Sequence, residues 1–120
     1  MTKKRILVVD DEQISRDGIA ELLQDEGYEV ATAADGHKAV TIFAAFQPDL
    51  VLTDLQMPGL DGTGVITHLK SVSPTTPVII FTADVTIDAR RKAERLGVQD
   101  YLNKPLNFDD MLTRIKRILT

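Results

Sequence analysis

The sequence predicts an α/β domain, a three-layer sandwich in which a parallel five-stranded sheet has helices on both faces. Five short runs rich in Val, Ile and Leu support this, because strands covered on both faces have such compositions. The stretches between the runs carry apolar residues at helical spacing, and parallel strands need helical crossovers of this kind. The five predicted strands are 5–9, 29–33, 49–53, 77–81 and 100–103.

The predicted helices rest on apolar spacing and on end signals. Gly27 and Gly97 fit the C-terminal ends of two helices, since glycine tolerates the left-handed conformation found there. Asp35 and Asn107 fit N-caps of two others. The first helix has its apolar residues at Ile14, Ile19, Leu22 and Leu23. The last has them at Phe108, Met111, Leu112, Ile115, Ile118 and Leu119.

Length and composition narrow the class of protein. At 120 residues the chain suits one domain, 1–120. A net charge of −4 is not that of a nucleic-acid-binding domain, so we expect no direct nucleic-acid contact. The apolar run at 6–9 is too short for a secretory signal, and nothing targets the chain to a membrane. The absence of cysteine fits a reducing cytoplasm. The final residues keep a helical pattern without a stop signal, which hints at a longer chain.

Chemically reactive side chains follow the predicted strands. In an open parallel sheet the carboxyl ends of the strands converge on one crevice, where sites are built. Asp10, Asp11 and Glu12 follow the first strand and Asp54 ends the third. A charge at the edge of a core costs free energy unless something compensates it. The fourth strand ends in Thr82 and Ala83, and the fifth is followed by Lys104.

This set of residues predicts phosphoryl chemistry. Crowded carboxylates repel one another, and a hard divalent cation with oxygen ligands compensates them, so we expect Mg²⁺ or another divalent ion such as Mn²⁺. Lys104 adds a positive charge to the same pocket. A carboxylate beside these cations can attack phosphorus, which makes Asp54 a candidate nucleophile. Thr82 could then donate a hydrogen bond to the phosphoryl oxygens, while Ala83 keeps the approach uncrowded.

The motifs resemble those of the response-regulator receiver domain of two-component signalling. Four motifs occur in the order and at the separations typical of the family, across essentially the whole chain: VVDDE, LTDLQMPGLDG, FTA and DYLNKP. The resemblance implies a flavodoxin-like fold with strand order 2-1-3-4-5. It also implies that Asp54 accepts a phosphoryl group from a phosphohistidine on a sensor histidine kinase or a histidine phosphotransfer protein.

The resemblance also assigns roles to individual residues. Asp11 and Asp54 would bind Mg²⁺ directly, Asp10 through water, and the backbone carbonyl of Gln56 would complete the protein ligands. Lys104 would pair with the phosphoryl group, and the Lys104–Pro105 bond is often cis in the family. The residues that flank the phosphoryl site and modulate it would be Gln56, Ala83 and Asp84.

A switch follows from the same resemblance. Phosphorylation adds charge and acceptor oxygens, so Thr82 would move toward them and Tyr101 would turn into the space it leaves. In receivers this changes a surface that here comprises 87–96, 100–103 and 108–119. We expect that surface to contact an output domain or downstream protein, and to form a homodimer. For Tyr101 a static role as a half-buried aromatic is the alternative.

Other functions compete with this hypothesis. A pseudo-receiver, an interaction module without phosphotransfer, is opposed by the intact set of acids, threonine and lysine. Phosphatases with an Asp nucleophile and Mg²⁺ place a second acid two residues further on, where this chain has Gln56. A flavin-nucleotide site is opposed by the three acids after the first strand, which would repel phosphate. We therefore expect a signalling switch that is not a turnover enzyme, although it catalyses its own phosphorylation and slow dephosphorylation.

Two groups of residues have ordinary explanations. The basic residues Arg90, Arg91, Lys92 and Arg95 are expected to form a solvated helix face. His37 and His68 fall within helical stretches and are expected at the surface.

Overall fold

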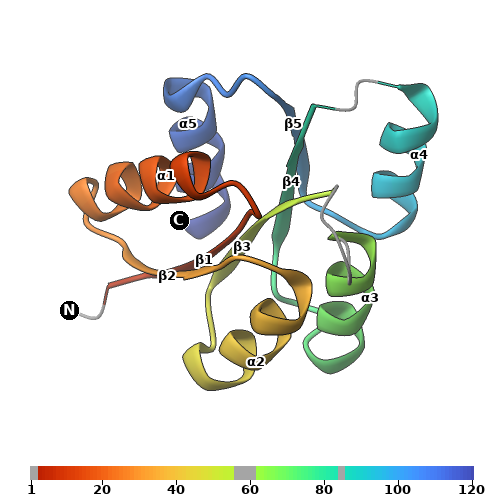
Figure 1. Ribbon diagram of the computed structural model, residues 1–120, viewed down its shortest axis with the longest axis horizontal. Helices are drawn as coiled ribbons and strands as arrows, with labels where there is room; N and C mark the ends of the chain where they lie inside the picture. Colours follow the sequence, from red (N-terminus) through yellow and green to blue (C-terminus); the bar gives the residue numbers. More distant parts are fainter. Residues whose placement is uncertain (1–2, 56–61, 84–85) are drawn as a thin grey trace.

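The computed structural model describes residues 3–55, 62–83 and 86–120. Five strands form one parallel sheet in the order β2-β1-β3-β4-β5 (Figure 1), which confirms the expected fold class and topology. The strands are β1 (Arg5–Val9), β2 (Glu29–Ala33), β3 (Leu50–Asp54), β4 (Val78–Thr82) and β5 (Asp100–Asn103). The helices are α1 (Gln13–Asp25), α2 (Gly36–Phe46), α3 (Gly62–Val72), α4 (Ile87–Arg95) and α5 (Phe108–Leu119). β3 and β4 begin and end one residue later than predicted.

Two apolar clusters separate the layers. Alternate strand residues point to opposite faces, so Ile6 and Val8 pack under α1 and α5 while Leu7 and Val9 pack under the other helices. Figure 1 shows α1 and α5 on one side of the sheet and α2, α3 and α4 on the other. β3 and β4 are buried along their whole length, whereas the edge strands β2 and β5 are partly exposed.

The predicted helix ends are confirmed. Gly27 and Gly97 have φ angles of 95° and 77° just after α1 and α4, a region that glycine enters without steric cost. The side chain of Asp35 accepts a hydrogen bond from the backbone N–H of Lys38, and that of Asn107 accepts one from Asp110.

Two predicted apolar positions lie outside the core. Ile14 is 85% exposed and Phe108 is 45% exposed, although both match the apolar spacing of their helices. Each lies in the first turn of its helix, where both line a hollow beside Lys104 and neither belongs to the apolar cluster beneath α1 and α5. The remaining predicted residues of α1 and α5 are buried or half-buried against the sheet.

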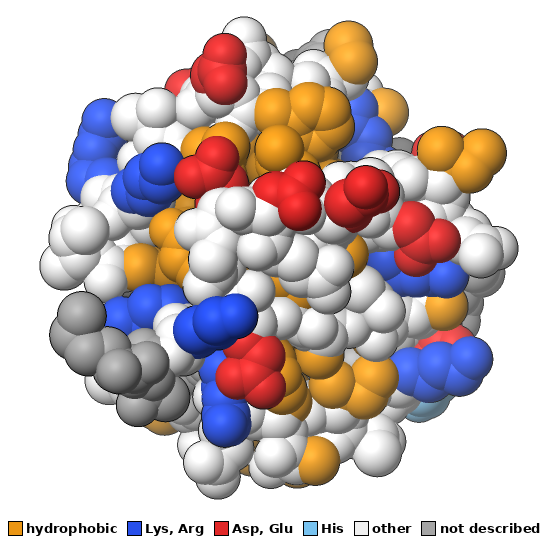
Figure 2. Space-filling model, turned by 90° about the vertical axis from the view of Figure 1, so that its left-hand side faces the viewer, with side chains coloured by type: hydrophobic (Ala, Val, Ile, Leu, Met, Phe, Trp, Pro, Cys, Tyr) orange, Lys and Arg blue, Asp and Glu red, His pale blue; other side chains and the backbone are white. Residues whose placement is uncertain are grey.

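The charged surface is mixed. On the face drawn in Figure 2, acidic and basic side chains are interspersed with several separate apolar groups. The four basic residues Arg90, Arg91, Lys92 and Arg95 are all exposed, as predicted, and so are His37 and His68.

Within the described residues, no helix is both long enough and apolar enough to cross a bilayer.

Candidate functional site

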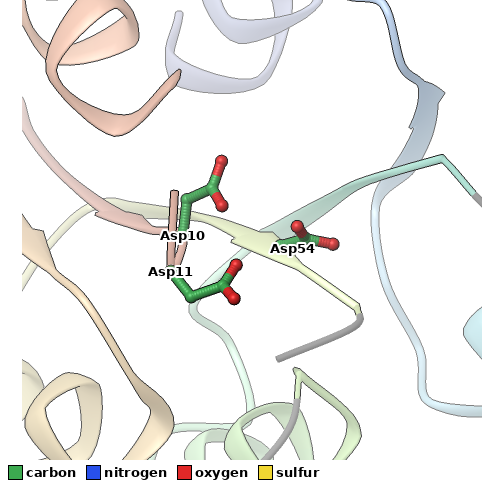
Figure 3. A group of neighbouring side chains, drawn as sticks. All are labelled: Asp10, Asp11 and Asp54. Atoms are coloured by element: carbon green, nitrogen blue, oxygen red, sulfur yellow. The ribbon is translucent and has the colours of Figure 1, made fainter. Parts of the chain in front are cut away.

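The register of the sheet brings the predicted acids together. β1 pairs with β3 so that Val9 lies opposite Thr53, and the next residues, Asp10 and Asp54, therefore meet at the carboxyl edge. Asp10, Asp11 and Asp54 each offer a carboxylate oxygen within 4.8 Å of the others. In Figure 3 they come from two neighbouring strand ends, and the side chain of Asp11 points toward Asp54.

The three acids differ in burial. Asp10 is fully buried, Asp54 is 6% exposed, and Asp11 is exposed. Buried carboxylates are unfavourable unless cations or hydrogen bonds compensate their charge. Glu12, the third acid after β1, contributes its backbone N–H to Asp10 Oδ1 at 3.1 Å and is not a member of the carboxylate group.

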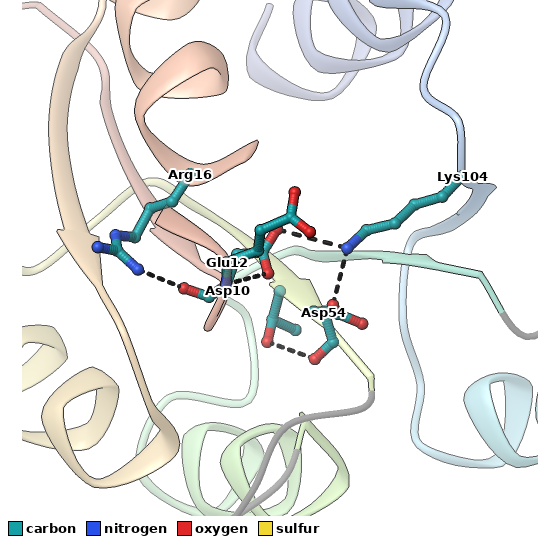
Figure 4. A network of polar contacts seen from close by, with 6 residues as sticks. Asp10, Glu12, Arg16, Asp54 and Lys104 are labelled. Carbon is teal, nitrogen blue, oxygen red and sulfur yellow. Dashed lines mark hydrogen bonds and ion pairs between the residues drawn. The ribbon is translucent and has the colours of Figure 1, made fainter. Parts of the chain in front are cut away.

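Lys104 supplies the compensating charge. Its Nζ donates to Asp54 Oδ2 at 2.9 Å and to Asp10 Oδ2 at 3.4 Å, so it lies between the two buried acids (Figure 4). The ammonium also lies over the ring of Phe81, 5.2 Å from its centre. Backbone contacts hold the segment: the Lys104 N–H donates to the Thr82 carbonyl at 2.8 Å, and the Lys104–Pro105 peptide is cis.

The acids keep Lys104 protonated. Burial by itself lowers the pKa of the ammonium, but the hydrogen bond to Asp54 and the charges of Asp54 and Asp10 outweigh burial and raise the pKa above its ordinary value. Lys104 therefore carries its charge throughout the neutral pH range, and that charge is directed at the carboxylate of Asp54.

The donor set fits a hard divalent cation. The group contains three carboxylates and, in the described residues, one lysine that contacts two of them, so a negative excess remains. All the ligand atoms are oxygens, which Mg²⁺ prefers, and none is a histidine or cysteine. Gln56, whose backbone carbonyl was predicted as a further ligand, lies outside the described residues.

The other predicted residues are placed as follows. Thr82 is fully buried at the end of β4, and Ala83 follows it with an exposed side chain. Tyr101 is half-buried on β5, where it packs against the cluster beneath α2, α3 and α4, and the Arg90 guanidinium lies 6.0 Å from its ring centre. Asp84 lies outside the described residues.

Two residues that the sequence did not indicate also support the site. Arg16 donates from its guanidinium to the Asp10 carbonyl at 2.9 Å. The buried Thr53 hydroxyl donates to the Asp54 carbonyl at 3.0 Å. Both act on main-chain carbonyls, which leave no side-chain pattern in a sequence. For Thr53, its position next to the candidate nucleophile was the one available signal.

Comparison with known proteins identifies the family. The family model described as response regulator receiver domain matches residues 6–116, nearly the whole chain. The chain belongs to this family. Receiver domains of known structure share its fold. The receiver domain protein of Methanospirillum hungatei JF-1 is 30% identical, with a TM-score of 0.94 over 98% of this chain and 94% of that one. Chemotaxis protein CheY4 of Vibrio cholerae is 28% identical, with a TM-score of 0.92 over 98% and 99%.

Curated relatives of this receiver domain are regulators of about twice its length. The response regulator MprA of Mycolicibacterium vanbaalenii is 36% identical over 96% of this chain and 50% of its own. The probable transcriptional regulator ycf27 of Cyanophora paradoxa is 43% identical over 99% of this chain and 49% of its own. The receiver domain thus spans about half the length of these relatives.

Proposed function

We propose that this receiver domain is a phosphorylation-activated switch of a two-component system, with Asp54 as the phosphoryl acceptor. The observation that carries the proposal is the Lys104–Asp54 contact of 2.9 Å beside two further carboxylates. An ion pair with a purely structural role does not need such a group of acids. The acids repel one another, so the group is unfavourable until cations bind to it. Phosphoryl transfer needs a positioned nucleophile among cations.

The chemistry starts from a phosphohistidine on a kinase or phosphotransfer protein. A carboxylate oxygen of Asp54 attacks phosphorus and forms the O–P bond. The P–N bond breaks, and its electron pair stays on the imidazole, which takes up a proton. Lys104 offsets the negative charge of the transferring group. The groups that would hold Mg²⁺ are Asp11, Asp54, Asp10 through water, and the Gln56 carbonyl. The bound ion would supply further positive charge at the phosphoryl oxygens. We propose that the domain is a switch, not a turnover enzyme.

An apolar rim beside Lys104 supports a protein as the donor. A hollow of about 430 Å³ lies between the starts of α1 and α5, with Lys104, Pro105 and the exposed Ile14 and Phe108 among its lining residues. Large exposed apolar side chains next to a reactive site are typical of a protein-binding surface. A small phosphodonor does not need such an apolar surface for binding.

The first test is phosphorylation of the wild-type domain. Incubation with acetyl phosphate is expected to add one phosphoryl group in Mg²⁺ and none in EDTA, because the acids repel an anionic donor until a cation joins them. Intact mass measures the gain. Hydroxylamine should remove the added group, since it cleaves acyl phosphates. A folded protein that gains no mass in Mg²⁺ would support the pseudo-receiver alternative.

The signal is proposed to leave through α4, β5 and α5. Phosphorylation draws the Thr82 hydroxyl toward the new phosphoryl oxygens, and Tyr101 turns inward. The residues that flank the phosphoryl site and modulate it are Gln56, Ala83 and Asp84. The surface has charges of both signs: α4 is basic, and α5 begins with Asp109 and Asp110. It therefore offers complementary patches to an output domain or to a second copy in the cytoplasm.

Dimer formation on activation is a prediction of this proposal. With Mg²⁺ and beryllofluoride, a phosphoryl mimic, the mass from light scattering during gel filtration is expected to shift toward two chains, because the rearranged surface pairs its basic and acidic patches. Asp100 and Asp110 already pair with Arg114 in the same chain, so Asp109 is the acid expected to meet α4 of the partner. A one-chain mass at high protein concentration with the mimic bound would contradict dimerisation.

A further inference from the structure

Four polar contacts fix the residue Asp10. Its backbone N–H donates to the Ala33 carbonyl at 3.1 Å, and its carbonyl accepts from Arg16 at 2.9 Å. Its carboxylate accepts from the Glu12 N–H at 3.1 Å and from Lys104 at 3.4 Å. Figure 4 shows Arg16 and Lys104 on opposite sides of Asp10. The main chain and the side chain of this buried residue are therefore each held by two polar contacts.

Asp11 has no comparable support. Its side chain is exposed, and among the described residues no hydrogen bond or ion pair holds its carboxylate. The direction of the side chain therefore depends on the backbone. The Asp10 carbonyl and the Asp11 N–H belong to one planar peptide group. A contact that fixes this carbonyl therefore also fixes the orientation of the peptide plane that precedes the Cα atom of Asp11.

We propose that Arg16 is a positioning residue, which by holding the Asp10 carbonyl aims the Asp11 carboxylate at a divalent cation shared with Asp54. The inference rests on the proposed function in taking that cation to be Mg²⁺. Mg²⁺ demands near-ideal ligand geometry, and partners that orient metal ligands change metal affinity by roughly 10- to 100-fold. A guanidinium about one turn into α1 thereby becomes part of the metal site without touching the ion.

The charge of Arg16 acts in the opposite direction. A guanidinium near the acids repels a cation, so its removal would by charge alone tighten Mg²⁺ binding, although solvent screens the effect. Loss of positioning would weaken binding. The sign of the change in affinity therefore separates a positioning role from a bystander charge.

The experiment is a Mg²⁺ titration followed by backbone amide chemical shifts. Arg16→Ala is expected to weaken Mg²⁺ binding about 10-fold, and Arg16→Lys, which keeps the positive charge and a donor of nearly the same reach, to weaken it less. Lys38→Ala, which removes one positive charge from an exposed site on α2, is expected to leave affinity unchanged. Unchanged or tighter binding by folded Arg16→Ala would overturn the inference.

A second measurement excludes general damage to the site. The initial rate of phosphorylation by acetyl phosphate in Arg16→Ala is expected to recover at saturating Mg²⁺, because the substitution affects cation binding and leaves Asp54 and Lys104 in place. A rate that stays low at saturating Mg²⁺ would overturn positioning through the metal. Absence of Mg²⁺ binding by the wild type would instead contradict the proposed function, so the two failures are distinguishable.

Discussion

An Asp54→Ala variant is expected to gain no phosphoryl group from acetyl phosphate, even at saturating Mg²⁺. In the proposed chemistry this carboxylate supplies the oxygen that attacks phosphorus, and no other described acid has both its burial and its 2.9 Å contact with Lys104. Intact mass after a fixed incubation measures the effect. Asp54→Asn, which keeps the shape of the side chain and loses the nucleophilic charge, is expected to be equally inert.

Asp17→Ala is the matched control for this experiment. Asp17 is an exposed acid on α1 outside the carboxylate group, so its loss should leave the mass gain intact. A gain that survives in Asp54→Ala would place the acceptor elsewhere. The neighbouring Asp10 and Asp11 would then be the first candidates, and cleavage of the adduct by hydroxylamine would fit an acyl phosphate on either of them.

A Lys104→Met variant is expected to lose about 3 kcal/mol of unfolding free energy in Mg²⁺-free buffer. Lys104 has 25% of its side chain exposed, while its partners Asp10 and Asp54 have 0% and 8% exposed. Methionine keeps most of the length of the side chain but leaves two buried carboxylates without their cation. Urea unfolding followed by far-ultraviolet circular dichroism measures the change, since the chain has no tryptophan.

Added Mg²⁺ should restore part of the lost stability, because a ligand that binds only the folded state stabilises it. Lys38→Met is the matched control, since it breaks a 4.0 Å ion pair with Asp35 on an exposed helix end. Exposed pairs contribute about 1 kcal/mol or less. Equal losses in the two variants would show that Lys104 is an ordinary surface lysine.

Most of the fold could be predicted because its causes are periodic. Runs of apolar residues gave the strands, and the crossover rule left a parallel sheet as the arrangement for alternating strands and helices. The acids and Lys104 could be grouped before the structure because they follow strands, and parallel strands bring their carboxyl ends to one edge. The strand order itself came from the family resemblance, since the residues alone do not fix it.

The exposure of individual residues and the contacts of the main chain could not be predicted, because the spacing of residue types along the sequence does not encode them. Ile14 and Ile19 both fit one helical pattern, yet one is 85% exposed and the other 1%, because the pattern does not show which turns of a helix are packed in the core. Arg16 reads in the sequence as one more charged residue of a solvated helix. Its role depends on the distance to a carbonyl, and only three-dimensional placement gives that distance.

The site joins distant parts of the chain: Lys104 is 50 residues from Asp54 and 94 from Asp10. A ribosome makes both acids long before it makes the lysine, and β5 is the last strand of this sheet to be made. A growing or truncated chain that lacks β5 therefore has the acceptor without its cation. With the proposed chemistry, competence to accept a phosphoryl group therefore marks a receiver domain whose sheet has been completed by β5.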